Sequence, residues 1–456
     1  MYHILMDIEI PQSAQTILDL LEAAGHEAYV VGGCVRDALI GRVPNDWDIT
    51  TSAKPEQIKA AAADAGLKTV DTGIKHGTVT VIVNHEPFEV TTYRADGTYS
   101  DGRHPDYIEF LDRIDGDLAR RDFTINAMAY NPTRGLVDHF GGQRDLEAGI
   151  LRAVGDPRER FTEDALRIVR GLRFAAQLGF TIEPETSNAM HELRNLLDDI
   201  AVERIWIEFA GLLCEPYAVP VLREYHDIVF VIIPELAVEY EFDQHNPFHV
   251  YDVWEHTLHA LEAAPPDMDA TVRLALLLHD IGKPHCLVID EEGRGRALGH
   301  DKEGEPIARE VCKRLKLSRA QCETVTHLVA HHMFHIPDTE RAMRRFLVRH
   351  GERHAQELFA IRRCDKIGLG HEQPPDNPMS VAFAKAEKLM DEQLNAEPVF
   401  GIKDLAVNGL DLIELGMEPG PSIGNVLQTL LEAVVDGDVS NEREALIACV
   451  QQLITR

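Results

Sequence analysis

The chain has 456 residues, 45% of them hydrophobic, and a formal net charge of −31. This length supports two or more domains, each with its own core. The acidic balance disfavours a protein that binds nucleic acid over most of its surface, because phosphate groups need local positive charge. It does not exclude a basic cleft, since residues 152–173 contain six arginines against four acidic residues.

Other features of the sequence predict a cytoplasmic protein without a membrane anchor. The first twelve residues, MYHILMDIEIPQ, lack the basic start and the apolar core of a secretory signal. The longest apolar stretches, such as residues 228–233, are too short to span a bilayer. The seven cysteines are scattered and form no CxxC pair, so neither a disulfide framework nor a zinc knuckle is expected.

The N-terminal part of the chain predicts a small sheet accompanied by helices. A helical pattern covers residues 14–24, and a shorter one follows Gly32-Gly33 over residues 35–40. Strand-like stretches rich in Val, Ile and Thr lie at 28–31, 49–50, 78–83 and 88–92. From Glu163 onward the pattern is helical almost throughout, with Thr162 as the expected N-cap. The predicted fold class is therefore α+β, with a sheet-containing head before helical regions.

Two aspartates, Asp46 and Asp48, alternate with Trp47 just before a predicted strand. At the two-residue period of a strand both carboxylates face one side, where they repel each other unless a cation lies between them. Mg²⁺ suits such a pair together with phosphate oxygens, and two ions can activate an attacking hydroxyl and stabilise departing pyrophosphate. Glu89, a strand acid with apolar neighbours, is the predicted third catalytic carboxylate.

A glycine turn precedes these aspartates in the segment VVGGCVRDALIGRVPNDWDIT. Gly32 and Gly33 close a strand-to-helix turn whose backbone can approach a phosphate closely. Arg36 is expected on the first turn of that helix, within reach of a triphosphate. A glycine pair or a DxD alone is common in ordinary turns. The combined arrangement of strand, glycine pair, helix and DxD within 20 residues predicts transfer of NMP units from NTPs.

This segment resembles the catalytic motif of the class II tRNA nucleotidyltransferases and bacterial poly(A) polymerases, in the polymerase-β-type superfamily. Further blocks follow in the family's order and extend the resemblance over roughly residues 28–210. They are ADGTYSDGRHPD (95–106, the mobile loop), DLARRDFTINAMAY (117–130, the second conserved block), ERFTEDALRIVRGLRF (159–174, the nucleotide-selecting helix) and ERIWIEF (203–209, the neck). The resemblance implies a polymerase-β-type head with a mixed sheet, followed by all-α neck, body and HD domains. It also implies a tRNA 3′ end as acceptor.

Asp164 and Arg167 lie three residues apart and would share one face of a helix. They offer a carboxylate acceptor beside a guanidinium donor. Cytosine and adenine each present an amino donor beside a ring-nitrogen acceptor, whereas uracil and guanine place a carbonyl opposite the carboxylate. The pair therefore predicts selection of CTP and ATP. The family resemblance adds Arg121, Arg170 and Arg173 as nucleotide-contacting positions.

Histidines and aspartates recur between residues 250 and 370 in the order H…HD…D. The predicted metal ligands are His256, His279, Asp280 and Asp365, with His300 and His331 as weaker additions that would make the centre binuclear. Imidazoles and carboxylates suit Ni²⁺, Mn²⁺, Co²⁺, Zn²⁺ or Fe²⁺, and a metal-bound water can attack a phosphoester. The order resembles the HD phosphohydrolase superfamily. This resemblance implies either hydrolysis of 2′,3′-cyclic or 2′-phosphates or a purely structural domain, and both alternatives are open.

We predict four regions: a catalytic head (1–150), a helical neck that binds RNA (151–240), an HD-like domain (241–370) and a C-terminal helical module (371–456). The predicted activity is addition of CCA to the tRNA 3′ end, with Mg²⁺, CTP and ATP and contacts to the acceptor stem. CC-only or A-only addition, poly(A) synthesis, and a phosphohydrolase with an RNA-binding head are alternatives. The acidic tail and the HD motif favour CCA addition over poly(A) synthesis, and the DxD disfavours the hydrolase alone. The sequence predicts no oligomeric state.

Overall fold

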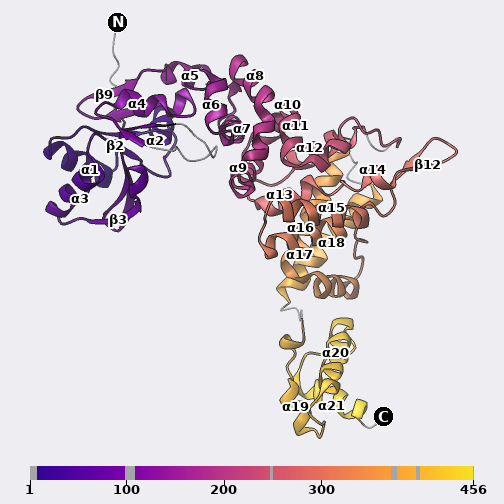
Figure 1. The fold of residues 1–456 in the computed structure, drawn as a ribbon. Coiled ribbons are helices and arrows are strands. Elements are labelled where there is room, and N and C mark those ends of the chain that lie inside the picture. The colour runs from indigo at the N-terminus through magenta and orange to yellow at the C-terminus, as the bar shows by residue number, and fades with distance from the viewer. Residues whose placement is uncertain (1–7, 98–107, 247–249, 371–376, 397–400, 455–456) are drawn as a thin grey trace. The chain divides into compact units, whose positions relative to one another are not determined.

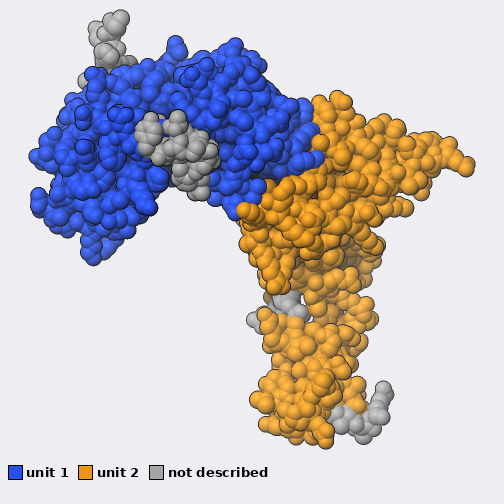
Figure 2. Space-filling view, in the orientation of Figure 1, with its two compact units in different colours: residues 1–234 blue, residues 235–456 orange. Residues whose placement is uncertain are grey.

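The computed structural model describes residues 8–97, 108–246, 250–370, 377–396 and 401–454 (Figure 1). The chain divides into two compact units, residues 1–234 and 235–456 (Figure 2). The four regions expected from the sequence divide the chain more finely and stay a prediction. Most of the loop predicted at residues 95–106 lies outside the described residues.

A mixed sheet forms the centre of the head in the first unit. Within the described residues its strands run in the order β3-β4-β5-β2-β1-β8-β9, and the β2–β5 pair is parallel while the other neighbours are antiparallel. The strands are β1 (Ala28–Val31), β2 (Ile49–Thr51), β3 (Lys68–Gly73), β4 (Thr78–Val83), β5 (Glu86–Thr92), β8 (Met128–Asn131) and β9 (Gly135–Asp138). The predicted fold class, with its mixed sheet, is confirmed.

The central strand β1 is buried on both faces, which explains its unbroken apolar sequence. Tyr29 and Val31 point to one face and pack with Leu118 of α4 (Ile114–Ala119). Helices α1 (Gln12–Ala23) and α3 (Pro55–Asp64) pack against the same sheet, and α2 (Gly33–Leu39) follows β1 directly. The loop after α2 therefore returns Asp46 and Asp48 to the end of β1.

Short elements complete the head. They are η1 (Ile74–His76), β6 (Arg94–Asp96), β7 (Ile108–Phe110), η2 (Thr124–Asn126), α5 (Gly142–Ala148), β10 (Ile150–Leu151) and β11 (Thr181–Ile182). Helices then take over, in agreement with the sequence pattern: α6 (Pro157–Glu163), α7 (Leu166–Leu178), α8 (Pro184–Leu193), η3 (Arg194–Asp199), α9 (Val202–Cys214), α10 (Ala218–Glu224), α11 (His226–Ile232) and η4 (Pro234–Glu239).

The expected helix start at Thr162 is wrong. Asp156 caps α6 instead, because its carboxylate accepts a hydrogen bond from the Arg158 backbone N–H and Pro157 occupies the first helical position. The chain then leaves helical geometry at Asp164, where φ is −146° and ψ is 100°. Thr162 lies inside α6, and Asp164 lies between two helices rather than within one.

The second unit is almost entirely helical. Its elements are α12 (Val253–Glu262), α13 (Ala270–Leu277), α14 (Lys283–Cys286), β12 (Val288–Ile289), β13 (Gly295–Arg296), α15 (His300–Arg314), α16 (Arg319–His331), α17 (Glu340–Gly368), α18 (Pro378–Asn395), η5 (Ile402–Asp404), α19 (Gly409–Glu414), α20 (Pro421–Asp436) and α21 (Arg443–Ile454). Helix α13 is buried along nearly its whole length and forms the core of the α12–α17 bundle. Among the described residues no helix is long and apolar enough to cross a membrane.

Candidate active sites

The three predicted catalytic carboxylates come together at the sheet of the head. The backbone carbonyl of Asp48 accepts a hydrogen bond from the Val31 N–H at 3.0 Å, so the aspartate loop is joined to the end of β1. Strands β2 and β5 are parallel and pair Ile49 with Val90. Because Asp48 and Glu89 each precede a member of this pair, they are neighbours across the two strands.

Electrostatic coupling shows that these carboxylates act on one another. The pKa of Asp48 is raised to about 6, first because protein atoms crowd the carboxylate and then because Asp46 and Glu89 repel its charge. The Arg121 guanidinium acts in the opposite direction. Asp48 nevertheless keeps exposed surface. Three neighbouring carboxylates, one of them with a raised pKa, are a fitting donor set for a hard divalent cation such as Mg²⁺.

Gly32 forms the turn that leads from β1 to α2. Its φ is 86°, in the region that favours glycine, and its N–H donates to the Met128 carbonyl at 3.0 Å. A Cβ at this position would lie only 2.8 Å from Nη1 of Arg121. The turn therefore brings the glycine backbone directly against an arginine that also acts on Asp48.

Replacing Gly32 with alanine is expected to raise KM for CTP several-fold and to lower the free energy of unfolding by about 1–3 kcal/mol, from backbone strain. The added methyl would also displace the Arg121 guanidinium. Gly41→Ala is the matched control, because Gly41 has φ 72° but its Cβ would meet nothing within 4 Å. Steady-state kinetics and urea unfolding check this. An equal rise in KM for both variants would contradict a role for the Arg121 contact.

The remaining arginines of the predicted nucleotide site are held by protein partners. Arg36 is buried and donates to Asp37 at 2.8 Å and to Asn126 at 2.9 Å. Arg170 makes two bonds to one oxygen of Asp122, at 2.8 and 3.0 Å. Arg173 forms an ion pair with Glu208 at 3.0 Å, and Glu208 also accepts from Arg170.

Phe174 is the common contact of these arginines. The guanidinium carbons of Arg36, Arg170 and Arg173 lie 5.3, 5.3 and 5.5 Å from the centre of its ring. Sequence reasoning missed Phe174 and the acidic partners Asp122 and Glu208. Asp122 follows Arg121 directly in RRDFTINA, and this adjacency was the one available signal.

Asp164 and Arg167 lie close in sequence, but each is oriented by other residues. Asp164 accepts from Arg204 at 2.9 Å and from the Leu166 backbone N–H at 3.1 Å. Arg167 donates to Glu163 at 2.7 Å and to the Arg120 backbone carbonyl at 3.0 Å. The expectation that they share one helix is wrong, because helix α6 ends before Asp164 and α7 begins after it. Their role as a pair that reads the base stays a prediction.

A second cluster lies in the α12–α17 bundle of the second unit. Nε2 of His256 is 3.2 Å from Oδ2 of Asp280 and 3.2 Å from Oδ1 of Asp365. Nε2 of His279 is 3.2 Å and 3.8 Å from the same two oxygens. Donor atoms around a tetrahedral ion with bonds of about 2.0–2.1 Å are separated by ~3.3 Å. The four residues that the sequence predicted thus converge at spacings that suit one metal ion.

The other oxygen of Asp280 faces a further pair of histidines. Oδ1 of Asp280 lies 3.2 Å from Nε2 of His300, which is 3.0 Å from Nε2 of His332. Burial, followed by the charges of His279 and His300, lowers the pKa of His332 to about 3, so its ring is neutral. The sequence prediction of His331 is wrong here, because His332 occupies this position. Asp280, His300 and His332 would together hold a second ion.

Comparison with known proteins assigns the chain to a family. A family model described as the poly A polymerase head domain matches residues 28–152, and one described as tRNA nucleotidyltransferase domain 2 matches residues 302–450. A third, described as a probable RNA and SrmB- binding site of polymerase A, matches residues 179–238. The CCA-adding enzyme of Streptococcus thermophilus is 34% identical over 449 residues, covering 97% of each chain. The chain belongs to the CCA-adding enzyme family. The CCA-adding enzyme of Leuconostoc mesenteroides is 35% identical and covers 96% of each chain.

A solved structure of the CCA-adding enzyme family supports the same assignment. The Bacillus stearothermophilus CCA-adding enzyme, crystallised in complex with CTP, aligns with 97% of this chain and 97% of its own at a TM-score of 0.71 and 30% identity. The chain is therefore a nucleotidyltransferase, and enzymes of this family generally use divalent metals such as Mg²⁺. The sequence resemblance to tRNA nucleotidyltransferases is confirmed.

Proposed function

We propose that this chain adds the CCA nucleotides to tRNA 3′ ends from CTP and ATP, without a nucleic-acid template, in the head site. The observation that carries the proposal is the electrostatic coupling of Asp48 to Asp46 and Glu89 beside the central strands β2 and β5, in a chain of this family. Relatives named CCA-adding enzymes match almost the full length, and one was crystallised with CTP. The acceptor stem of tRNA is the expected RNA partner.

The three carboxylates would hold two Mg²⁺ ions, which supply activation of the tRNA 3′ hydroxyl and neutralisation of the pyrophosphate charge. Arg121 lies against Gly32 at the same carboxylates and would bind triphosphate oxygens. The turn at Gly32 leaves no room for a side chain at that position, so phosphate groups can approach the backbone closely. The protein thus positions the nucleotide and the charges before the reaction begins.

Asp164 and Arg167 would select the base. Asp164 accepts hydrogen bonds and Arg167 donates them, and both are already positioned by neighbours from three segments of the chain. Positioned side chains lose little entropy when a base binds. One such pair suits cytosine and adenine alike, which is what successive addition of C and A requires.

The Arg167→Ala variant is expected to lose discrimination against UTP and GTP by about 10- to 100-fold, corresponding to about 1–3 kcal/mol. The matched control is Arg158→Ala, which removes an exposed arginine of α6 that pairs with Glu192. Single-nucleotide incorporation with each of the four NTPs checks this. Unchanged use of CTP and ATP and unchanged rejection of UTP by a folded Arg167→Ala protein would retire the base-reading role.

The alternatives from the sequence have less support. The relatives that match nearly the full length of the chain are described as CCA-adding enzymes, not as poly(A) polymerases or as CC-only or A-only enzymes. A hydrolase with a merely RNA-binding head does not account for the coupled carboxylates. Action in the cytoplasm and the four-region division, with an RNA-binding neck at 151–240, remain predictions.

A second activity, metal-dependent phosphoester hydrolysis, is favoured by the cluster around Asp280. His256, His279, Asp280 and Asp365 would hold one ion, and His300 and His332 a second one through the other Asp280 oxygen. The donor set of imidazoles and carboxylates suits Mn²⁺, Ni²⁺, Co²⁺, Zn²⁺ or Fe²⁺. A bound ion would supply an activated water for attack on phosphorus. Lys283 contacts Asp280 at 2.7 Å and would balance its remaining charge.

A further inference from the structure

A second group of histidines lies on helices α16 and α17, outside the Asp280 cluster. His327 and His331 are separated by four residues on α16, so both rings are on one face of that helix. His350 and His354 have the same spacing on α17. The two helices therefore present two HxxxH pairs to each other.

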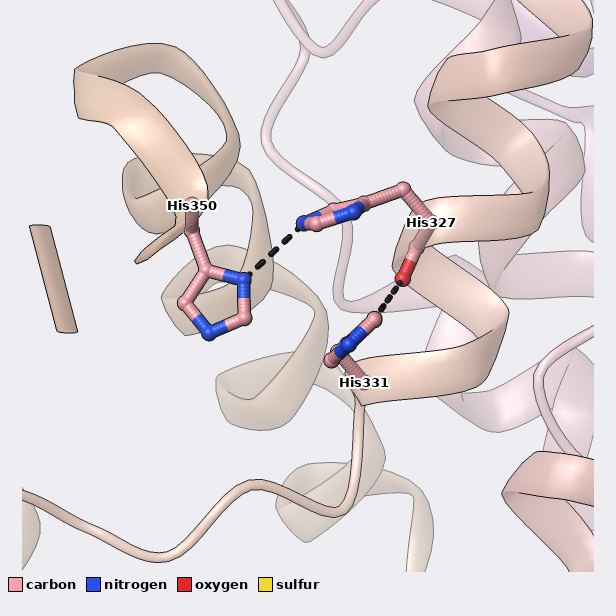
Figure 3. A group of neighbouring side chains, drawn as sticks. All are labelled: His327, His331 and His350. Atoms are coloured by element: carbon pink, nitrogen blue, oxygen red, sulfur yellow. Dashed lines mark hydrogen bonds between the residues drawn. The ribbon is translucent and has the colours of Figure 1, made fainter. Parts of the chain in front are cut away.

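Ring nitrogens converge within this group (Figure 3). Nε2 of His327 lies 2.9 Å from Nδ1 of His350, and one nitrogen from each of His327, His331 and His350 lies within 4.8 Å of the others. His354 stacks on the His327 ring with centroids 4.7 Å apart and contacts Thr324 at 3.3 Å. Each neutral imidazole has one nitrogen lone pair that needs a partner. A metal ion bound between the three rings would accept all three lone pairs.

A kink in α17 creates this arrangement. Gly351 has φ 72° and ψ 162°, so the long helix is broken directly after His350. The break lies between the two histidines of the α17 pair and changes the direction of the helix at the point where His350 meets α16. Glycine tolerates this backbone conformation better than any other residue.

We infer that His327, His331 and His350 form a divalent transition-metal site that joins α16 to the kinked α17. Zn²⁺, Co²⁺ and Ni²⁺ prefer imidazole ligands, and donor atoms around such an ion are ~3.3 Å apart. His331 donates Nδ1–H to the His327 carbonyl at 2.9 Å, which leaves its Nε2 lone pair for the metal. This outer hydrogen bond is typical of histidine ligands.

Two of the three rings are neutral near pH 7, as histidine ligands must be. Burial and then the neighbouring imidazoles lower the pKa of His327 to about 4 and that of His350 to about 3. The Phe346 ring covers His350 at 4.5 Å and limits solvent access. The inferred ligands are distinct from those around Asp280, because His331 lies beside His350 while its neighbour His332 faces His300.

Metal content of the full chain tests the inference. Protein stripped with EDTA, saturated with Zn²⁺ or Co²⁺ and freed of excess would be measured by elemental analysis and visible Co²⁺ absorption. We expect His331→Gln to bind the ion of this site at least tenfold more weakly. After excess metal is removed, the variant should therefore retain one fewer ion per chain than wild type. His335→Gln, an exposed histidine four residues further on, is the matched control and should retain the wild-type content.

A second variant keeps the test decisive if His331→Gln is unstable. His350→Asn retains a polar group near the position of Nδ1 and should also lose one ion, while circular dichroism verifies folding. The Co²⁺ spectrum distinguishes the sites, since three imidazoles give a different ligand field from the Asp280 cluster with its carboxylates. Equal metal content and equal Co²⁺ spectra in wild type and both folded variants would overturn the inference.

Discussion

Replacing Asp48 with asparagine is expected to lower the rate of CTP and ATP addition by at least about a thousandfold, because loss of transition-state charge stabilisation on this scale corresponds to about 4 kcal/mol. The same variant should be more stable than wild type when metal is absent. The carboxyl pKa is raised to about 6 in the folded protein, so ionisation at pH 7 opposes folding. Since Asp48 keeps solvent contact, the gain is discounted to about 1 kcal/mol.

The sign of this effect gives a pH dependence. The folded protein binds the Asp48 proton more tightly than the unfolded chain, so this residue's unfavourable contribution disappears as pH falls from about 6 to 4. Nucleotide addition should decline over the same range, because a protonated Asp48 no longer binds Mg²⁺, and added Mg²⁺ should shift the decline to lower pH.

Single-turnover extension assays and urea unfolding with and without Mg²⁺ measure these effects. Glu86→Gln, an exposed glutamate on the same strand as Glu89, is the matched control and should retain wild-type activity. Any phosphohydrolase activity of the second unit should persist in Asp48→Asn. A folded Asp48→Asn protein that still adds nucleotides, or that is less stable than wild type without metal, would contradict the assignment.

Replacing Asp280 with asparagine is the second change with a large expected effect. Asp280 is buried beside Lys283 and three histidines, and it contacts the cluster through both of its oxygens. Removing one partner of a buried charge pair costs about 3–5 kcal/mol. We expect loss of bound metal and of phosphohydrolase activity, while nucleotide addition by the folded fraction continues.

Hydrolysis of a 2′,3′-cyclic phosphate with Ni²⁺ or Mn²⁺ measures this activity. Because Asp280→Asn is strongly destabilising, Asp365→Asn provides a second test at the edge of the cluster, where the carboxylate also accepts from Arg362 at 3.0 Å. Asp267→Asn, at an exposed loop position, is the control. If wild type neither retains metal nor hydrolyses the substrate, the cluster has a structural role alone.

Part of the candidate site in the head could be predicted from the sequence because Asp46 and Asp48 are close together along the chain. The alternation of Asp46 and Asp48 before a strand sufficed to group them. Such patterns of period two and of a single turn are local. Glu89 was predicted only as a strand acid with apolar neighbours, and the pairing of its strand with the one after Asp48 is visible in the structure alone. The same local patterns predict the α+β class, whereas the polymerase-β-type head with its mixed sheet was implied by the family resemblance; both are confirmed.

The sequence could not predict which of two neighbouring helical residues faces a site. His331 and His332 are adjacent, but one residue of a helix turns the side chain by about 100°. Only the packing of α16 against α13 and α17 decides that His332 faces Asp280 while His331 faces His350. Similarly, the local pattern does not reveal that α6 ends before Asp164, whose carboxylate accepts a hydrogen bond from Arg204, 40 residues further along the chain.

One site in the head is expected to add both C and A to tRNA. In the most direct measurement, tRNA that lacks its 3′ trinucleotide is incubated with the protein, Mg²⁺ and equal concentrations of all four NTPs. The 3′ ends of the products are then sequenced. When wild-type protein is the only enzyme present, nearly all extended tRNA molecules should end in CCA. Runs of A, termination after CC, or release of phosphate without extension would contradict this expectation.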